Sequence, residues 1–183
     1  MFDTIGGLPI HPLVVHAVEV IVPLAALAVL LAAVWPRFRR WAFGLPLLLA
    51  LGALVLVPVA TQSGEALEER VGETPAVELH TQMGEDLTPW VIGLAVVAAA
   101  LFYLTWQSRR GGGGRGGAGP GDSAMSRATA WTAPRWVPAV LMVAALVVST
   151  GTIVQAVRIG HSGATAVWGQ TGAGSPSDEG DED

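Results

Sequence analysis

The chain has 183 residues, of which 51% are hydrophobic and only 14% are charged, and its formal net charge is −5. Soluble domains carry about 25% charged residues, so the composition excludes an ordinary soluble globule and indicates a membrane protein with polar ends. The chain has no cysteine, which excludes disulfides, cysteine-bound iron–sulfur clusters and covalent haem attachment. Its negative charge disfavours nucleic-acid binding.

Four apolar runs predict the fold class. Each run has enough residues to cross a hydrocarbon core of about 30 Å as a helix, and none alternates in the way that barrel strands do. We therefore predict an all-α protein, a four-helix transmembrane bundle embedded in the lipid bilayer. The runs are residues 13–34, 43–60, 90–106 and 137–157.

The arginines predict the topology. Eight of the ten lie in two connections, one between the first and second runs and one between the third and fourth. Arginine-rich short connections stay in the cytoplasm, so both termini are expected outside. The connection between the second and third runs is acidic and is expected to be an outer, short helical loop.

The chain is expected to divide into four stretches and shows no internal repeat. Within the outer loop, Ser63 is a candidate N-cap for one short helix, and PAVELHTQMGED is expected to form a second. The Gly/Arg-rich stretch is typical of a flexible linker and the acidic tail of a disordered segment. The stretches are 1–106 with outer loop 61–87, the cytoplasmic linker 107–135, the fourth span with its motif at 136–168, and the tail 169–183.

All four histidines are expected at the outer side of the membrane: His11, His16, His80 and His161. His16 and Glu19 are three residues apart and share a helix face. Glu19 lies about two turns into the first span, where a carboxylate is costly. It is expected to be protonated, to hydrogen-bond His16, or to sit shallow enough to reach the outer interface. His11 and His16 are five residues apart, so a straight helix cannot point both at one ion.

The histidines leave several functions open. One is a b-type haem held by His16 with His161 or His80, with His11 as a further candidate ligand. A second is a metal site of several of these histidines with Glu65 or Glu78, although no standard ligand spacing is present. A third is a structural cluster that joins the helix ends. A small transporter using Glu19 as a proton relay is a fourth. No catalytic motif is present, so no catalytic residue is predicted.

Specific motifs resemble a bacterial membrane family, the domain of unknown function 2231. They are a Leu-Pro-x-His-Pro-x-x-x-His opening, a Thr-x-x-Gly after the second run, a His before the third run and a Gly-His-x-Gly after the fourth. The likeness extends over nearly the whole chain except the linker and the tail. The matching positions are His11, Pro12, His16, Thr61, Gly64, His80, Gly160, His161 and Gly163.

The resemblance implies a multi-pass protein of the bacterial cytoplasmic membrane with four helices. Relatives occur fused or adjacent to redox modules such as Rieske-type or cytochrome b5-like domains, which favours electron transfer or a haem site. Glu19 stands where an apolar residue is usual, so it falls outside the family's shared chemistry. Because the chain lacks cysteine, any redox partner is expected to be another protein.

Overall fold

The computed structural model describes residues 4–5, 8–71, 75–112, 134 and 136–168. The described chain is almost entirely helical, which confirms the all-α prediction. A short antiparallel ribbon, formed by β1 (Thr4–Ile5) and β2 (Leu8–Pro9), precedes the first helix. The helices are α1 (Ile10–Val34), α2 (Pro36–Ala42), α3 (Leu45–Val71), α4 (Pro75–Glu85), α5 (Thr88–Gly112) and α7 (Val137–Trp168).

Four of these helices, α1, α3, α5 and α7, contain stretches long and apolar enough to span a membrane. Large apolar side chains such as Leu48, Val55 and Val96 point outward, each more than 60% exposed, as a lipid-facing surface requires. Small residues such as Ala25 and Ala53 fill the interior, which lets the helix backbones approach closely. The protein is therefore a multi-pass membrane protein by the architecture of its helices.

Of the two short helices expected in the outer loop, the structure contains one. The second expected helix exists as α4, but the first does not, because α3 continues without interruption to Val71. Ser63 therefore caps no helix, and its hydroxyl donates instead to the Ala60 carbonyl one turn earlier. A break separates α4 from α5 just before Pro89, which has no N–H to donate and whose ring would clash with the Glu85 carbonyl in a continuous helix.

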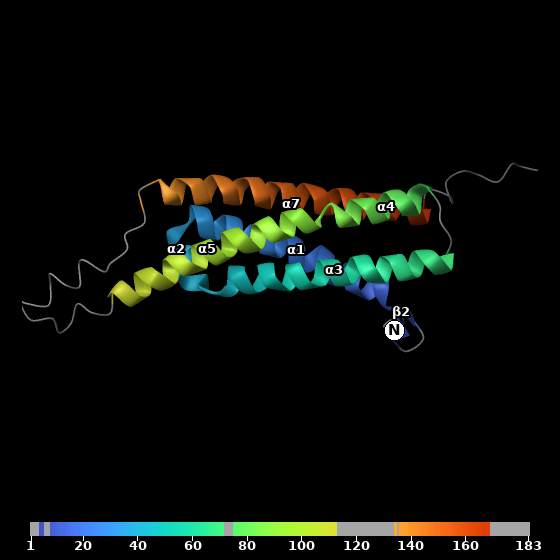
Figure 1. Cartoon of the computed structure of the whole chain (residues 1–183), viewed down its shortest axis with the longest axis horizontal. Coiled ribbons are helices and arrows are strands. Elements are labelled where there is room, and N and C mark those ends of the chain that lie inside the picture. The colour runs from blue at the N-terminus through green and yellow to red at the C-terminus, as the bar shows by residue number, and fades with distance from the viewer. Residues whose placement is uncertain (1–3, 6–7, 72–74, 113–133, 135, 169–183) are drawn as a thin grey trace, which may run out of the picture.

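The four long helices form a closed ring in the order α1, α3, α5, α7, and α4 packs on the C-terminal part of α7 (Figure 1). At about 1.5 Å per residue, α3 and α7 are roughly 40 and 48 Å long, so both extend beyond a hydrocarbon core of about 30 Å. The β-ribbon and the C-terminal end of α7 lie at the same end of the bundle.

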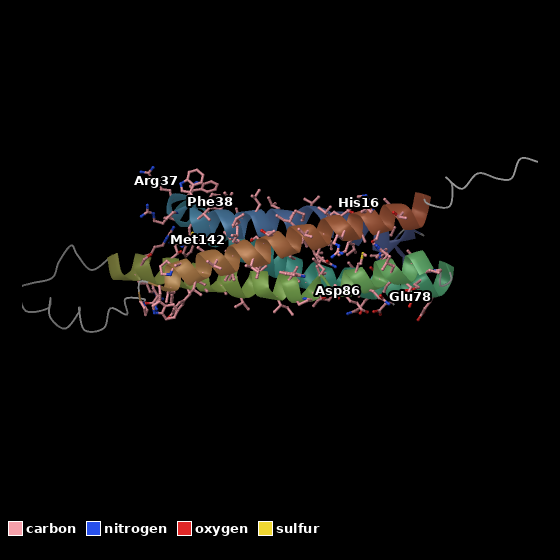
Figure 2. All side chains as sticks on the ribbon, turned by 90° about the horizontal axis from the view of Figure 1, so that it is seen from above. His16, Arg37, Phe38, Glu78, Asp86 and Met142 are labelled. Atoms are coloured by element: carbon pink, nitrogen blue, oxygen red, sulfur yellow. The ribbon has the colours of Figure 1, made fainter. Side chains whose placement is uncertain are left out.

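The two ends of the bundle carry opposite charge. Figure 2 shows Arg37 at one end and His16, Glu78 and Asp86 toward the other. We call these the arginine end and the histidine end. At the arginine end, the Arg109 guanidinium lies 4.1 Å from the Phe43 ring centroid. Burial, helped by the neighbouring Arg40, lowers the pKa of Arg39, yet a guanidinium keeps its charge at neutral pH.

The structure contains an internal repeat that the sequence did not reveal. The hairpin α1–α3 corresponds to the hairpin formed by α4, α5 and α7, and the two hairpins run parallel about the bundle axis. Each residue of α1 corresponds to the residue 69 positions later, so that His11 corresponds to His80. Each residue of α3 corresponds to the residue 99 positions later, so that Gly52 corresponds to Gly151. The difference between the two shifts reflects the longer connection between α5 and α7.

The burial pattern supports this register for the buried residues of α1 and for three of the four buried residues of α3. The buried residues of α1 are Val22, Ala25, Ala26, Ala28, Val29 and Ala32, and their counterparts Val91, Leu94, Ala95, Val97, Ala98 and Leu101 are all buried in α5. In α3, Pro46, Ala50 and Ala53 are buried, and so are Ala145, Ser149 and Thr152 in α7. Two of the predicted stretches fall largely outside the described residues. They are the linker 107–135, of which only 107–112 and Pro134 are described, and the tail 169–183.

Candidate functional site

His11 joins the first turns of α1 to α3. Its Nδ1 lies 3.1 Å from the Ala60 carbonyl oxygen and 3.1 Å from the Ser63 Oγ. The ring rests against Gly64, where a Cβ would come within 3.1 Å of the imidazole Cε1. A glycine at this position therefore makes room for the imidazole between the two helices.

His80 repeats this arrangement between α4 and α7. Its Nδ1 lies 3.0 Å from the Ser162 Oγ, and a Cβ at Gly163 would again come within 3.1 Å of the imidazole Cε1. Ser162 donates to the Ile159 carbonyl at 2.9 Å, as Ser63 donates to the Ala60 carbonyl at 2.9 Å. The two halves of the fold thus contain the same joint, made of a histidine and a Ser-Gly pair.

The partners of each Nδ1 determine where the ring proton lies. A carbonyl oxygen only accepts hydrogen bonds, so the Nδ1 of His11 must be the donor to Ala60. Ser162 already donates its proton to a carbonyl, so the Nδ1 of His80 donates to the Ser162 Oγ. In a neutral imidazole, the Nε2 then carries a lone pair. Within the described chain, neither Nε2 has a hydrogen-bond partner.

The two anchored histidines lie at the histidine end of the bundle and belong to different halves of the fold, His11 in the first turn of α1 and His80 in α4 (Figure 1). The repeat places them in equivalent positions on α1 and α4. The arrangement therefore offers two imidazoles with matched anchors and two unused nitrogen lone pairs.

The other two histidines are placed differently. Both side chains are exposed. The Nδ1 of His16 bonds to the carbonyl of Pro12 within its own helix. His161 lines a groove between α4 and α7. Among the described residues, neither imidazole is held by a second helix in the way that His11 and His80 are.

The remaining candidate residues fall into separate roles. The Thr61 hydroxyl donates to the Val57 carbonyl within α3. Glu19 lies across the α1–α7 contact from Gly160, where a Cβ would be 3.7 Å from the carboxylate. The described residues show no hydrogen bond between Glu19 and His16, so that expected pairing is absent there.

A mononuclear metal site of several histidines with Glu65 or Glu78 has no counterpart in the described chain. No group of three or more histidine, aspartate or glutamate side chains there could hold a metal ion. The Glu65 and Glu78 side chains are exposed. The four histidines share one end of the bundle, but the structure does not bring them together as one cluster.

A groove of about 400 Å³ opens between α4 and α7 beside the His80 joint. Ser162 belongs to both features, since it accepts the hydrogen bond from His80 and also lines the groove. The other lining residues are Leu79, Met83, Val157, Arg158, His161 and Thr165.

The comparisons with known proteins give one match. The family model described as a predicted membrane protein, domain of unknown function 2231, matches residues 7–174. The chain belongs to this family. The curated proteins and the solved structures give no match.

The DUF2231 match covers both joints, and it also includes the two histidines outside them. Sequence reasoning selected His11, His80, Gly64 and Gly163 but missed Ser63 and Ser162 as their hydrogen-bond partners. A signal was present, because a Ser-Gly pair follows the apolar run in each half of the DUF2231 domain. That signal becomes readable only when the two halves are aligned.

Proposed function

We propose that this membrane protein holds a b-type haem between His11 and His80 and acts as an electron carrier at the histidine end of the bundle. One observation carries the proposal, namely two imidazoles anchored through Nδ1 in equivalent positions, each with an unused Nε2 lone pair. Histidines that bind metals are oriented in this way, by a hydrogen bond from the second ring nitrogen.

The number of ligands favours haem over a bare metal ion. A zinc site takes three or four protein ligands, and the described residues offer no group of three. A haem would bring most of the iron's ligands with it, so the protein would need to supply only one or two. Four-helix bundles commonly hold cofactors between facing helices. The donor set of His11 and His80 therefore fits a haem better than a mononuclear metal.

Three kinds of residue would have different roles at the proposed site. His11 and His80 would bind the iron, Ser63 and Ser162 would orient the imidazoles, and Gly64 and Gly163 leave space for the rings. A bound haem would supply one-electron chemistry at this end of the membrane. A one-electron carrier needs a redox partner, which we propose to be a separate protein.

The test is an absorption spectrum of the detergent-purified full-length protein, oxidised and dithionite-reduced, from cells supplied with haem. We expect a Soret band and sharp reduced α and β bands, both lost in His11→Ala and His80→Ala. The matched controls are His16→Ala and His161→Ala, which remove exposed imidazoles from the same end and should leave the spectrum intact.

A featureless spectrum of the unmodified protein would overturn the proposal. The same hydrogen bonds also support a second, non-enzymatic role, in which each joint only fastens two helix ends. In that case, His11→Ala and His80→Ala would lower the unfolding temperature while no bound species is lost.

A further inference from the structure

The two halves of the repeat differ most in the groove beside His80. Arg158, His161 and Thr165 line this groove. Their counterparts 99 positions earlier are Val59, Gln62 and Ala66. The second half therefore has a cation, an imidazole and a hydroxyl where the first half has mostly apolar groups.

Arg158 lies at the boundary of the hydrocarbon core. The helix α7 begins at Val137, and no charged residue occurs before Arg158. The 21 intervening steps correspond to about 31 Å of helix, which matches the thickness of the core. The guanidinium therefore stands near the level at which lipid phosphates lie.

The groove has two chemically distinct parts. Leu79, Met83 and Val157 form an apolar wall, and Leu79 and Val157 are 49% and 67% exposed. Arg158 is also exposed, and within the described residues it makes no ion pair or hydrogen bond. An unpaired cation next to an apolar wall at the membrane interface is complementary to a molecule with an anionic head and a hydrocarbon tail.

We propose that the α4–α7 groove binds one anionic phospholipid, with its phosphate at Arg158, an acyl chain along Met83 and Val157, and its headgroup region beside Leu79. His161 and Thr165 line the polar part. The His161 imidazole can donate a hydrogen bond to the headgroup, whereas the Thr165 hydroxyl already donates to the His161 carbonyl. This proposal concerns the groove alone and does not depend on the proposed haem.

The test uses the absence of cysteine from the chain, because one introduced thiol then reports one position. The full-length Leu79→Cys protein is placed in nanodiscs of phosphatidylcholine, or of phosphatidylcholine with phosphatidylglycerol, and the rate of modification by a neutral maleimide is measured. We expect phosphatidylglycerol to slow the modification several-fold. Leu13→Cys, exposed on α1 near the same end, is the control and should react equally in both lipids.

Variants of Arg158 test whether the positive charge of its side chain causes the protection of Cys at position 79. In the Leu79→Cys background, Arg158→Gln should abolish the protection, and Arg158→Lys, which keeps the charge, should retain much of it. Equal rates in the two lipids, or protection that persists in Arg158→Gln, would overturn the proposal. Protection by inorganic phosphate in pure phosphatidylcholine discs would also overturn it, since a free anion would then suffice.

Discussion

The Nδ1 atoms of His11 and His80 differ in the number of acceptors that hold them. His11 has both a carbonyl and a serine hydroxyl, whereas His80 has the hydroxyl of Ser162. A hydrogen bond from Nδ1–H makes the opposite nitrogen a more basic ligand. The serine therefore matters more to His80 than to His11.

This difference gives a matched pair of variants for the proposed haem. Ser162→Ala should raise the midpoint potential, because a less basic imidazole stabilises the oxidised iron less. One hydrogen bond of about 0.5–1.5 kcal/mol corresponds to roughly 20–60 mV for one electron. Ser63→Ala should shift the potential less, since the Ala60 carbonyl remains as an acceptor. Redox titration of the reduced α band measures both, and equal shifts would contradict the assignment.

Ser149 lies fully buried in the middle of α7, and its hydroxyl has no hydrogen-bond partner among the described residues. Its counterpart in the first half is Ala50, which is equally buried. Leaving a buried hydroxyl unsatisfied costs about 1–3 kcal/mol. We therefore expect Ser149→Ala to raise the free energy of unfolding by about 1 kcal/mol, measured by denaturant titration in mixed micelles.

The control for that variant is Thr152→Ala on the same face of α7. The Thr152 hydroxyl donates to the Val148 carbonyl at 2.6 Å, so this substitution removes a satisfied group and a packed methyl. Its free energy of unfolding should fall. A fall of similar size in Ser149→Ala would show that Ser149 has a partner, such as a buried water.

At the scale of the helices, two equivalent glycines make different contacts. A Cβ at Gly151 would lie 2.0 Å from the Trp90 ring, whereas a Cβ at Gly52 would lie 3.8 Å from Ile21. Gly151→Ala should therefore lower the free energy of unfolding by about 1–3 kcal/mol through overpacking of α5 against α7. Gly52→Ala should be neutral or gain up to about 1 kcal/mol from helix propensity.

The same unfolding titration compares the two glycine variants. Adding Trp90→Ala to Gly151→Ala should recover part of the loss, because the smaller side chain removes the clash. Equal behaviour of the two single variants would show that the tight packing of Trp90 on Gly151 is not maintained in the bilayer.

The four long helices were predictable from hydropathy, but hydropathy reports only the segments that lie in lipid. Lipid demands long apolar helices, so hydropathy located α1, α3, α5 and α7. It could not locate the end of α3, because the polar stretch after Ser63 continues as a helix outside the core. Nor could hydropathy show that the Trp90 ring packs against Gly151 of a neighbouring helix.

The candidate site was predictable in its members but not in their pairing. Spacing along one helix linked His16 to Glu19, yet the structure links His11 to Ser63, 52 residues away. Such a contact depends on how two helices pack, which no local pattern encodes. The repeat was missed because few residues are identical between the halves, and the shared feature is burial rather than sequence.

At the scale of the whole molecule, the separation of charge predicts an orientation. Because arginine-rich connections remain in the cytoplasm, the histidine end should face outward. In intact cells, a membrane-impermeant maleimide should modify Glu78→Cys but not Ser108→Cys, both of which replace exposed residues at opposite ends. Ser108→Cys should react only after the membrane is permeabilised. The reverse pattern would place the histidine end in the cytoplasm.

The internal repeat also bears on ancestry. A gene encoding one hairpin would give a protein whose copies associate about a two-fold axis, each copy contributing one anchored histidine. After fusion of two such genes, the two halves no longer need to have the same sequence, so one half can gain a new function while the other keeps the old one. Val59 and Arg158 stand at matched positions, a difference that the two identical subunits of a homodimer could not show.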